Sequence, residues 1–134
     1  MKKYIALVLA LMMCLSLCAC GTTSSENALD VKDAVIGTWK CYYELTEDSP
    51  PVNKAGDTYS QTIELYKGGT GKIYWYNETR NHDGINFSLT WEIEDGVVNI
   101  AYGVFGIDSY EGLEYNFETD TLTKIDGGRV FYRV

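Results

Sequence analysis

The feature that most constrains this chain is a regular alternation of apolar and polar side chains over most of its length. It is clearest in INFSLTWEIE, residues 85–94, where every second residue is apolar: Ile85, Phe87, Leu89, Trp91 and Ile93. A period of two places the apolar set on one face of an extended chain, which is typical of a half-buried antiparallel strand. Asp95-Gly96 follows, a pair favoured in hairpin turns because both positions tolerate positive φ. We therefore predict a hairpin, with VVNIAY, residues 97–102, as the returning strand.

The same reasoning gives eight strand segments. They are VIGTWKCYYEL (35–45), TYSQTIELY (58–66), KIYWYNET (72–79), INFSLTWEIE (85–94), VVNIAY (97–102), LEYNFE (113–118), TLTKI (121–125) and RVFYRV (129–134). The longest connection is TEDSPPVNKAGD, after the first strand. From residue 36 onward we find no convincing helical stripe, and one short helical turn is expected within residues 25–34.

Eight antiparallel strands joined in chain order by short turns predict an all-β fold, an up-and-down barrel over residues 34–134. An open sheet of that size would leave two bare edges and an exposed apolar face, and closure removes the edges. A two-sheet sandwich is the main alternative.

The beginning of the chain has a different pattern. Lys2 and Lys3 precede an uncharged, largely apolar run over residues 4–17, which is typical of a secretory signal peptide and short for a membrane span. The sequence Leu17-Cys18-Ala19-Cys20-Gly21 resembles the lipobox of bacterial lipoproteins. This resemblance implies a signal peptide over residues 1–19 and a diacylglyceryl group on Cys20.

The residues after Cys20 are small and polar, so residues 20–33 are predicted to form a flexible tether. Two acyl chains hold a protein stably on a membrane where one chain is marginal. We therefore expect the protein to be lipid-anchored at the extracytoplasmic face of the cell membrane.

Other interpretations of the cysteines are weaker. A zinc site built on Cys18 and Cys20 would need two more ligands, and the rest of the chain offers Cys41 and His82. A disulfide framework needs an even set of cysteines after cleavage. We expect neither a metal nor a cofactor.

The charge of the chain bears on its partners. Eleven basic residues face 19 acidic ones, for a net charge of −8, and removal of Lys2 and Lys3 would make the chain still more acidic. Phosphate backbones repel such a surface, so nucleic acid is not an expected partner.

Three segments carry a family resemblance: VIGTWKCYYE with its Gly37-Thr38-Trp39, LYKGGTGKIYW, and FSLTWEIEDGVVNI. Together they resemble the small lipocalin-like domains of bacterial lipoproteins, over roughly residues 35–134. The resemblance implies that Trp39 plugs one end of the barrel and that a basic residue of the last strand packs over its indole. Arg133 is the better match for that residue, and Arg129 is second.

Catalysis has little support in the sequence. His82 lies near Glu78 and Asp83, but no fixed spacing ties the three together, so we interpret them as a solvated hairpin tip. No serine stands in a nucleophile-elbow motif. Cys41 is predicted to point inward as a small buried residue. We do not expect an enzyme.

Aromatic residues are the remaining candidates for function. Those predicted to face inward are Tyr43, Tyr59, Trp75, Phe87, Trp91, Tyr102 and Tyr115. They either line a pocket for an apolar or sugar-like ligand or simply fill the barrel. Those predicted to face outward are Tyr42, Tyr66, Tyr74, Tyr76 and Phe131, of which Tyr66, Tyr74 and Tyr76 form a candidate patch for a partner.

The sequence thus gives two functional hypotheses. The first is a membrane-anchored binding module that takes a small apolar ligand. The alternative is a non-catalytic interaction or structural protein of the cell envelope, which presents the tyrosine patch to a protein or a glycan.

Overall fold

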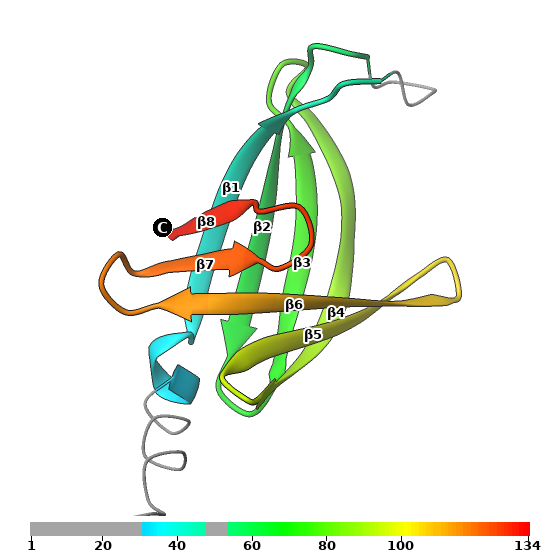
Figure 1. Cartoon of the computed structure of the whole chain (residues 1–134). Coiled ribbons are helices and arrows are strands. Elements are labelled where there is room, and N and C mark those ends of the chain that lie inside the picture. The colour runs from blue at the N-terminus through cyan, green and yellow to red at the C-terminus, as the bar shows by residue number, and fades with distance from the viewer. Residues whose placement is uncertain (1–30, 48–53) are drawn as a thin grey trace, which may run out of the picture.

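The structure, a computed structural model, describes residues 31–47 and 54–134. Eight antiparallel strands form one closed barrel in chain order, which confirms the predicted up-and-down barrel (Figure 1). The strands are β1 (Gly37–Glu44), β2 (Thr58–Tyr66), β3 (Thr70–Asn77), β4 (His82–Glu94), β5 (Val97–Val104), β6 (Ile107–Asn116), β7 (Thr121–Lys124) and β8 (Val130–Arg133). A short helical turn over residues 31–34 precedes β1.

The barrel closes where β8 pairs with β1, through Trp39 opposite Arg133 and Lys40 opposite Tyr132. In Figure 1 the strands β1 to β4 lie upright in the view, with β1 and β3 running up and β2 and β4 running down, and β6 to β8 cross in front of them. One end of the barrel carries the helical turn and the β2–β3, β4–β5 and β6–β7 turns. The opposite end carries the β3–β4, β5–β6 and β7–β8 connections.

The β5–β6 hairpin is longer than the sequence predicts. Strand β6 begins at Ile107 and not at Leu113, because Phe105 and Gly106 form the turn with φ values of 50° and 84°. A phenylalanine is unusual at positive φ, so composition gave no turn signal there. The Asp95-Gly96 turn, in contrast, is confirmed, with φ values of 50° and 79°.

The core follows the alternation. Inward-facing side chains are fully buried toward the helical turn, among them Val35, Trp39, Ile63, Ile73 and Leu113. The outward assignment of Phe131 is wrong, because its side chain is completely buried while its neighbour Tyr132 is 61% exposed. In RVFYRV polarity alone favours Val130, Tyr132 and Val134 as the inward set, because Phe131 alternates with two arginines, but the pairing of β8 with β1 turns Phe131 inward.

Gly71 marks a close approach of neighbouring strands. It pairs with Leu65 of β2 and Leu89 of β4, and a Cβ atom there would overlap the Glu64 carbonyl oxygen and lie 2.9 Å from Leu89 Cδ1. Both strands are fixed by their ladders, so neither neighbour has room to move. Only glycine fits at this position.

We predict that Gly71→Ala destabilises the barrel by about 1–3 kcal/mol, the usual cost of forcing extra volume into a packed site. The matched control is Gly103→Ala, also within a strand, where no atom lies within 4 Å of the added Cβ. That change should be neutral or slightly stabilising. Urea titration of both variants measures the difference, and equal midpoints would contradict the prediction.

Candidate functional site

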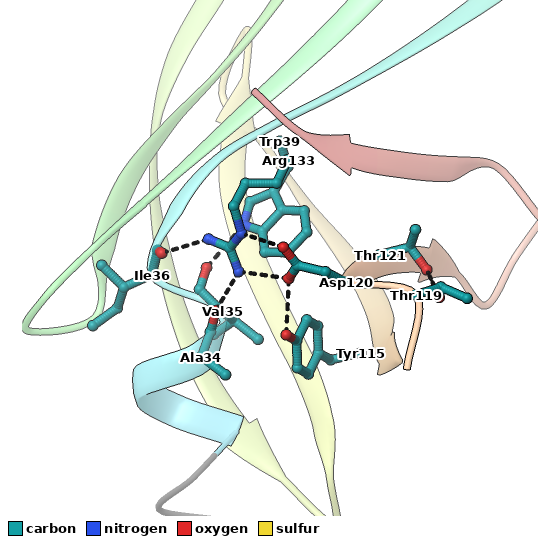
Figure 2. A network of polar contacts seen from close by, with 9 residues as sticks. All are labelled: Ala34, Val35, Ile36, Trp39, Tyr115, Thr119, Asp120, Thr121 and Arg133. Atoms are coloured by element: carbon teal, nitrogen blue, oxygen red, sulfur yellow. Dashed lines mark hydrogen bonds and ion pairs between the residues drawn. The ribbon is translucent and has the colours of Figure 1, made fainter. Parts of the chain in front are cut away.

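Trp39 closes the barrel at the end that carries the helical turn (Figure 2). Its side chain has no exposed surface, and its Nε1 donates a hydrogen bond to the Val35 carbonyl oxygen at 2.8 Å. The Arg133 guanidinium carbon lies 4.1 Å from the centre of the indole ring, which is a cation–π contact. The edge of the Tyr115 ring packs on the same indole, with 5.9 Å between ring centres.

Arg133 joins three segments that are distant in the sequence. It donates to the carbonyl oxygens of Ile36 at 3.0 Å and Ala34 at 2.6 Å, and it forms a two-pronged pair with Asp120 at 2.7 and 2.8 Å. Hydrogen bonding to Arg133 holds the pKa of the Asp120 carboxyl below its usual value. A Cβ atom on Gly37 would lie 2.6 Å from Arg133 Nη1, so the glycine of the Gly37-Thr38-Trp39 motif makes room for the guanidinium.

Inside the barrel, towards the opposite end, lies a group that we call the interior polar cluster: Gln61, Tyr102, Glu111 and Lys124. Tyr102 donates its hydroxyl to Glu111 Oε1 at 2.6 Å, and Lys124 Nζ lies 3.1 Å from the same oxygen. Burial and the hydrogen bond to Glu111 raise the pKa of Tyr102, so the phenol stays protonated. Burying a charged group inside a barrel costs free energy unless the charge is paired. Here only one of the two Glu111 carboxylate oxygens has partners among the described residues.

Two atoms of this cluster lack hydrogen-bond partners. Gln61 is 1% exposed and the Glu111 side chain 10%, yet Gln61 Oε1 and Glu111 Oε2 are the buried side-chain atoms without a partner among the described residues. A buried acceptor that accepts no hydrogen bond costs about 1–3 kcal/mol. Both atoms are acceptors, so a ligand that donates hydrogen bonds would satisfy them.

Arg129 stands next to this cluster at the rim of the barrel. It is exposed, and its guanidinium lies 3.8 Å from the centre of the Tyr43 ring. Cys41, on the same strand as Tyr43, is 3% exposed, and burial raises the pKa of its thiol. A thiol that stays protonated is a poor nucleophile, so Cys41 acts as a small packing residue.

An aromatic wall completes this end. The rings of Trp75, Phe87 and Tyr102 lie mutually 6.1–6.2 Å apart, and the Phe105 ring lies 6.4 Å from Phe87. The Phe105 side chain is 84% exposed, and its backbone has positive φ. Trp75 and Phe87 face inward but are only half-buried.

The β3–β4 connection is fixed to the same end by a buried carboxylate. Asp57 Oδ2 accepts hydrogen bonds from Arg80 Nε at 2.5 Å and Asn77 Nδ2 at 3.0 Å, and Asn77 also donates to the Tyr59 hydroxyl at 3.0 Å. Hydrogen bonds from Arg80 and Asn77 lower the pKa of Asp57 to about 2. The carboxylate therefore stays ionised and keeps this rim in place.

The structure divides the inward aromatic residues of the sequence analysis into two groups. Tyr43, Tyr59, Trp75, Phe87 and Tyr102 lie near the interior polar cluster or on the aromatic wall. Trp91 and Tyr115 lie towards the end that Trp39 closes, where Trp91 Nε1 donates to the carbonyl oxygens of Tyr66 and Thr70 at 3.1 and 3.0 Å. Those two side chains support the closed end.

The tyrosine patch also divides. Tyr74 and Tyr76 line a hollow of about 900 Å³ on the outer face of β1 to β4, together with Tyr42. Tyr66 is not among the residues that line it, and its hydroxyl bonds to Glu64. We call this hollow the outer groove.

Sequence reasoning missed Gln61, Glu111 and Lys124. Extending the period of two backwards from Leu113 would have placed Glu111 inward, and extending it forwards from Leu122 would have done so for Lys124. Gln61 and Lys124 lie within the predicted strands 58–66 and 121–125, whereas Glu111 lies before the predicted strand 113–118, and none of the three is apolar enough to mark an inward position. Arg129 was considered only as a partner for Trp39, and it lies on Tyr43 instead.

Other candidate sites add little. His82 begins β4 and is exposed, and no group of three or more metal-ligating side chains occurs within residues 31–47 and 54–134. No helix in those ranges is long and apolar enough to cross a membrane. Cys20, the predicted signal peptide and most of the predicted tether lie outside the described residues. Comparison of the chain with protein-family models, curated proteins and solved structures gives no match.

We predict that Trp39→Ala lowers the free energy of unfolding by about 3–5 kcal/mol, the usual cost of removing a fully buried large aromatic side chain. The control is Tyr42→Ala, on the opposite face of the same strand, where the ring is 64% exposed. That change should stay within about 0.5 kcal/mol. Urea titration measures both variants, and a change below about 1 kcal/mol for Trp39→Ala would show that the indole does not hold the barrel closed.

Proposed function

We propose that this protein is a non-catalytic binding protein, a lipocalin-like barrel that takes a small ligand at the end opposite Trp39. The observation that carries the proposal is the pair of buried acceptors, Gln61 Oε1 and Glu111 Oε2, which have no partner inside the barrel. A barrel that only had to be filled would be more stable with apolar side chains at these positions, because half-satisfied polar groups are costly. Their presence favours recognition of a ligand.

The side chains at this end indicate what the ligand contains. The aromatic wall of Trp75, Phe87 and Tyr102 would pack against an apolar body. Gln61 and Glu111 would accept hydrogen bonds from it. Lys124 and the exposed Arg129 are two cations near one carboxylate, so an acidic group on the ligand is favoured at the rim. We therefore refine the predicted ligand to a small, mainly apolar molecule with a polar, preferably anionic, end.

Two fluorescent dyes with the same aromatic skeleton test this chemistry. 8-Anilino-1-naphthalenesulfonate carries a sulfonate, and N-phenyl-1-naphthylamine is neutral. We expect the full chain to bind the sulfonate more tightly, although the net charge of −8 opposes any anion. Arg129→Gln should weaken the sulfonate about fivefold and leave the neutral dye unchanged, because a partly exposed ion pair contributes up to about 1 kcal/mol.

The control for this experiment is Lys67→Gln, which removes a positive charge from the exposed β2–β3 turn. It should change neither dye. Equal affinities of the two dyes for the wild-type chain, or an equal loss in the two variants, would count against an anion-selective rim. Urea midpoints of the variants separate a binding effect from unfolding.

We further propose that the protein is a lipoprotein, held at the extracytoplasmic face of the cell membrane by diacylglyceryl on Cys20. The support is in the sequence: Lys2 and Lys3, the apolar run, and Leu17-Cys18-Ala19-Cys20. Attachment would place the barrel within reach of molecules that cross or leave the membrane. The acidic surface does not favour anionic headgroups, so the acyl chains would supply the attachment.

Replacement of the lipidated residue tests the anchor. Cys20→Ser should move the protein from the membrane to the soluble fraction of the producing bacterium, while the near-ultraviolet circular dichroism of the barrel stays unchanged. Cys41→Ser is the matched control and should remain with the membrane, because that thiol is buried inside the barrel. Recovery of the wild-type chain in the soluble fraction would refute the anchor.

A further inference from the structure

The outer groove is built by the register of β1 to β4. Across these strands Tyr42 is opposite Ser60, and Ser60 is opposite Tyr76. One row further along, Lys40, Thr62 and Tyr74 are aligned in the same way. These residues alternate with Trp39 and Cys41, whose side chains are buried in the barrel, so the two rows face outward.

Small side chains on β2 make the floor, and long side chains on the two flanking strands make the walls. Ser60 and Thr62 are only 1% and 2% exposed although they face outward, because their neighbours rise above them. Strands β1 and β3 lie about 10 Å apart across β2, and Thr38 to Tyr42 spans about 13 Å. The outer groove, a hollow of about 900 Å³, therefore has Tyr42 on one side and Tyr74 and Tyr76 on the other.

The polar groups of the outer groove are held in defined positions. Glu78 accepts a hydrogen bond from Ser60 Oγ at 2.7 Å and lies 3.1 Å from Lys40 Nζ, which stands 4.8 Å from the centre of the Tyr42 ring. The hydrogen bonds from Ser60 and Lys40 lower the pKa of Glu78, so it remains an acceptor. Glu64 and Lys72 are opposite each other in the register of β2 and β3.

We propose that the outer groove binds a neutral oligosaccharide, at a site separate from the one proposed inside the barrel. Tyrosine rings suit the C–H faces of sugar rings, and the partly exposed donor of Lys40 and acceptor of Glu78 suit hydroxyl groups.

Other occupants fit the groove less well. An extended peptide would add along a free strand edge, but β2 and β3, at the centre of the groove, are paired on both sides. The charged side chains of the groove nearly balance, with Lys40 and Lys72 facing Glu64, Glu78 and Asp83. A charged polymer therefore gains little there, and an anionic one is also repelled by the net charge of −8.

Isothermal titration of the full chain with maltohexaose, cellohexaose and chitohexaose tests the proposal. We expect at least one of them to bind with a Kd below about 1 mM. Tyr42→Ala and Tyr74→Ala should each weaken that binding about tenfold or more, because aromatic contacts dominate such interfaces. Tyr110→Ala is the matched control: its ring is 74% exposed on β6, away from the groove, and binding should not change.

Three results would overturn the proposal. They are the absence of binding for all three sugars at millimolar concentration, an equal loss in Tyr110→Ala, and sugar binding that survives both groove variants. A tryptic digest of unfolded casein is titrated in parallel, and peptide binding that Tyr42→Ala removes, without sugar binding, would assign the groove to peptides. Urea midpoints of the variants confirm that each one is folded, and dye binding inside the barrel reports the other site independently.

Discussion

Closure of the barrel depends on the guanidinium of Arg133. The seam between β1 and β8 is the shortest in the sheet, with two register pairs, whereas β1 and β2 share eight. Backbone pairing alone gives little stability over so short a distance. Arg133 adds hydrogen bonds to Ala34, Ile36 and Asp120 and covers the indole of Trp39, so one side chain ties the last strand to the first, to the helical turn and to the β6–β7 turn. Its charge is fixed and its donors form a rigid fork, and lysine has neither property.

This closed end leaves the opposite end free to carry polar groups. All of the strong apolar packing lies around Trp39, where Ile63, Leu113 and Phe131 have no more than traces of exposed surface. Towards the other end the inward positions change to Gln61, Glu111 and Lys124, and the aromatic side chains become half-buried. The polar half of the interior therefore lies beside an apolar half whose side chains are completely buried. This gradient along the barrel is the physical basis of the proposed ligand site.

Much of the fold could be predicted from the sequence because one feature, the alternation of apolar and polar side chains, decides it. A period of two fixes which side chains face inward, and the Asp95-Gly96 turn fixes the register of a hairpin, so eight strands in chain order lead to a closed barrel. The alternation failed at Phe131, which shares its face of β8 with two arginines, and where an inward position is charged, as at Glu111. Both failures have the same cause. Pairing with a neighbouring strand chooses the face, and it can override the polarity of a single residue.

The outer groove could not be predicted for a different reason. Its tyrosines were visible in the sequence, but a groove requires small side chains between them, and Ser60 and Thr62 lie on another strand. Because adjacent residues of β1 and β3 point to opposite faces, the same strands build both proposed sites: Tyr43 and Trp75 face inward, and Tyr42, Tyr74 and Tyr76 face outward. The side chains of the two proposed sites are therefore different, although they alternate along the same strands. Each proposed site can be tested by substitutions at positions that do not belong to the other.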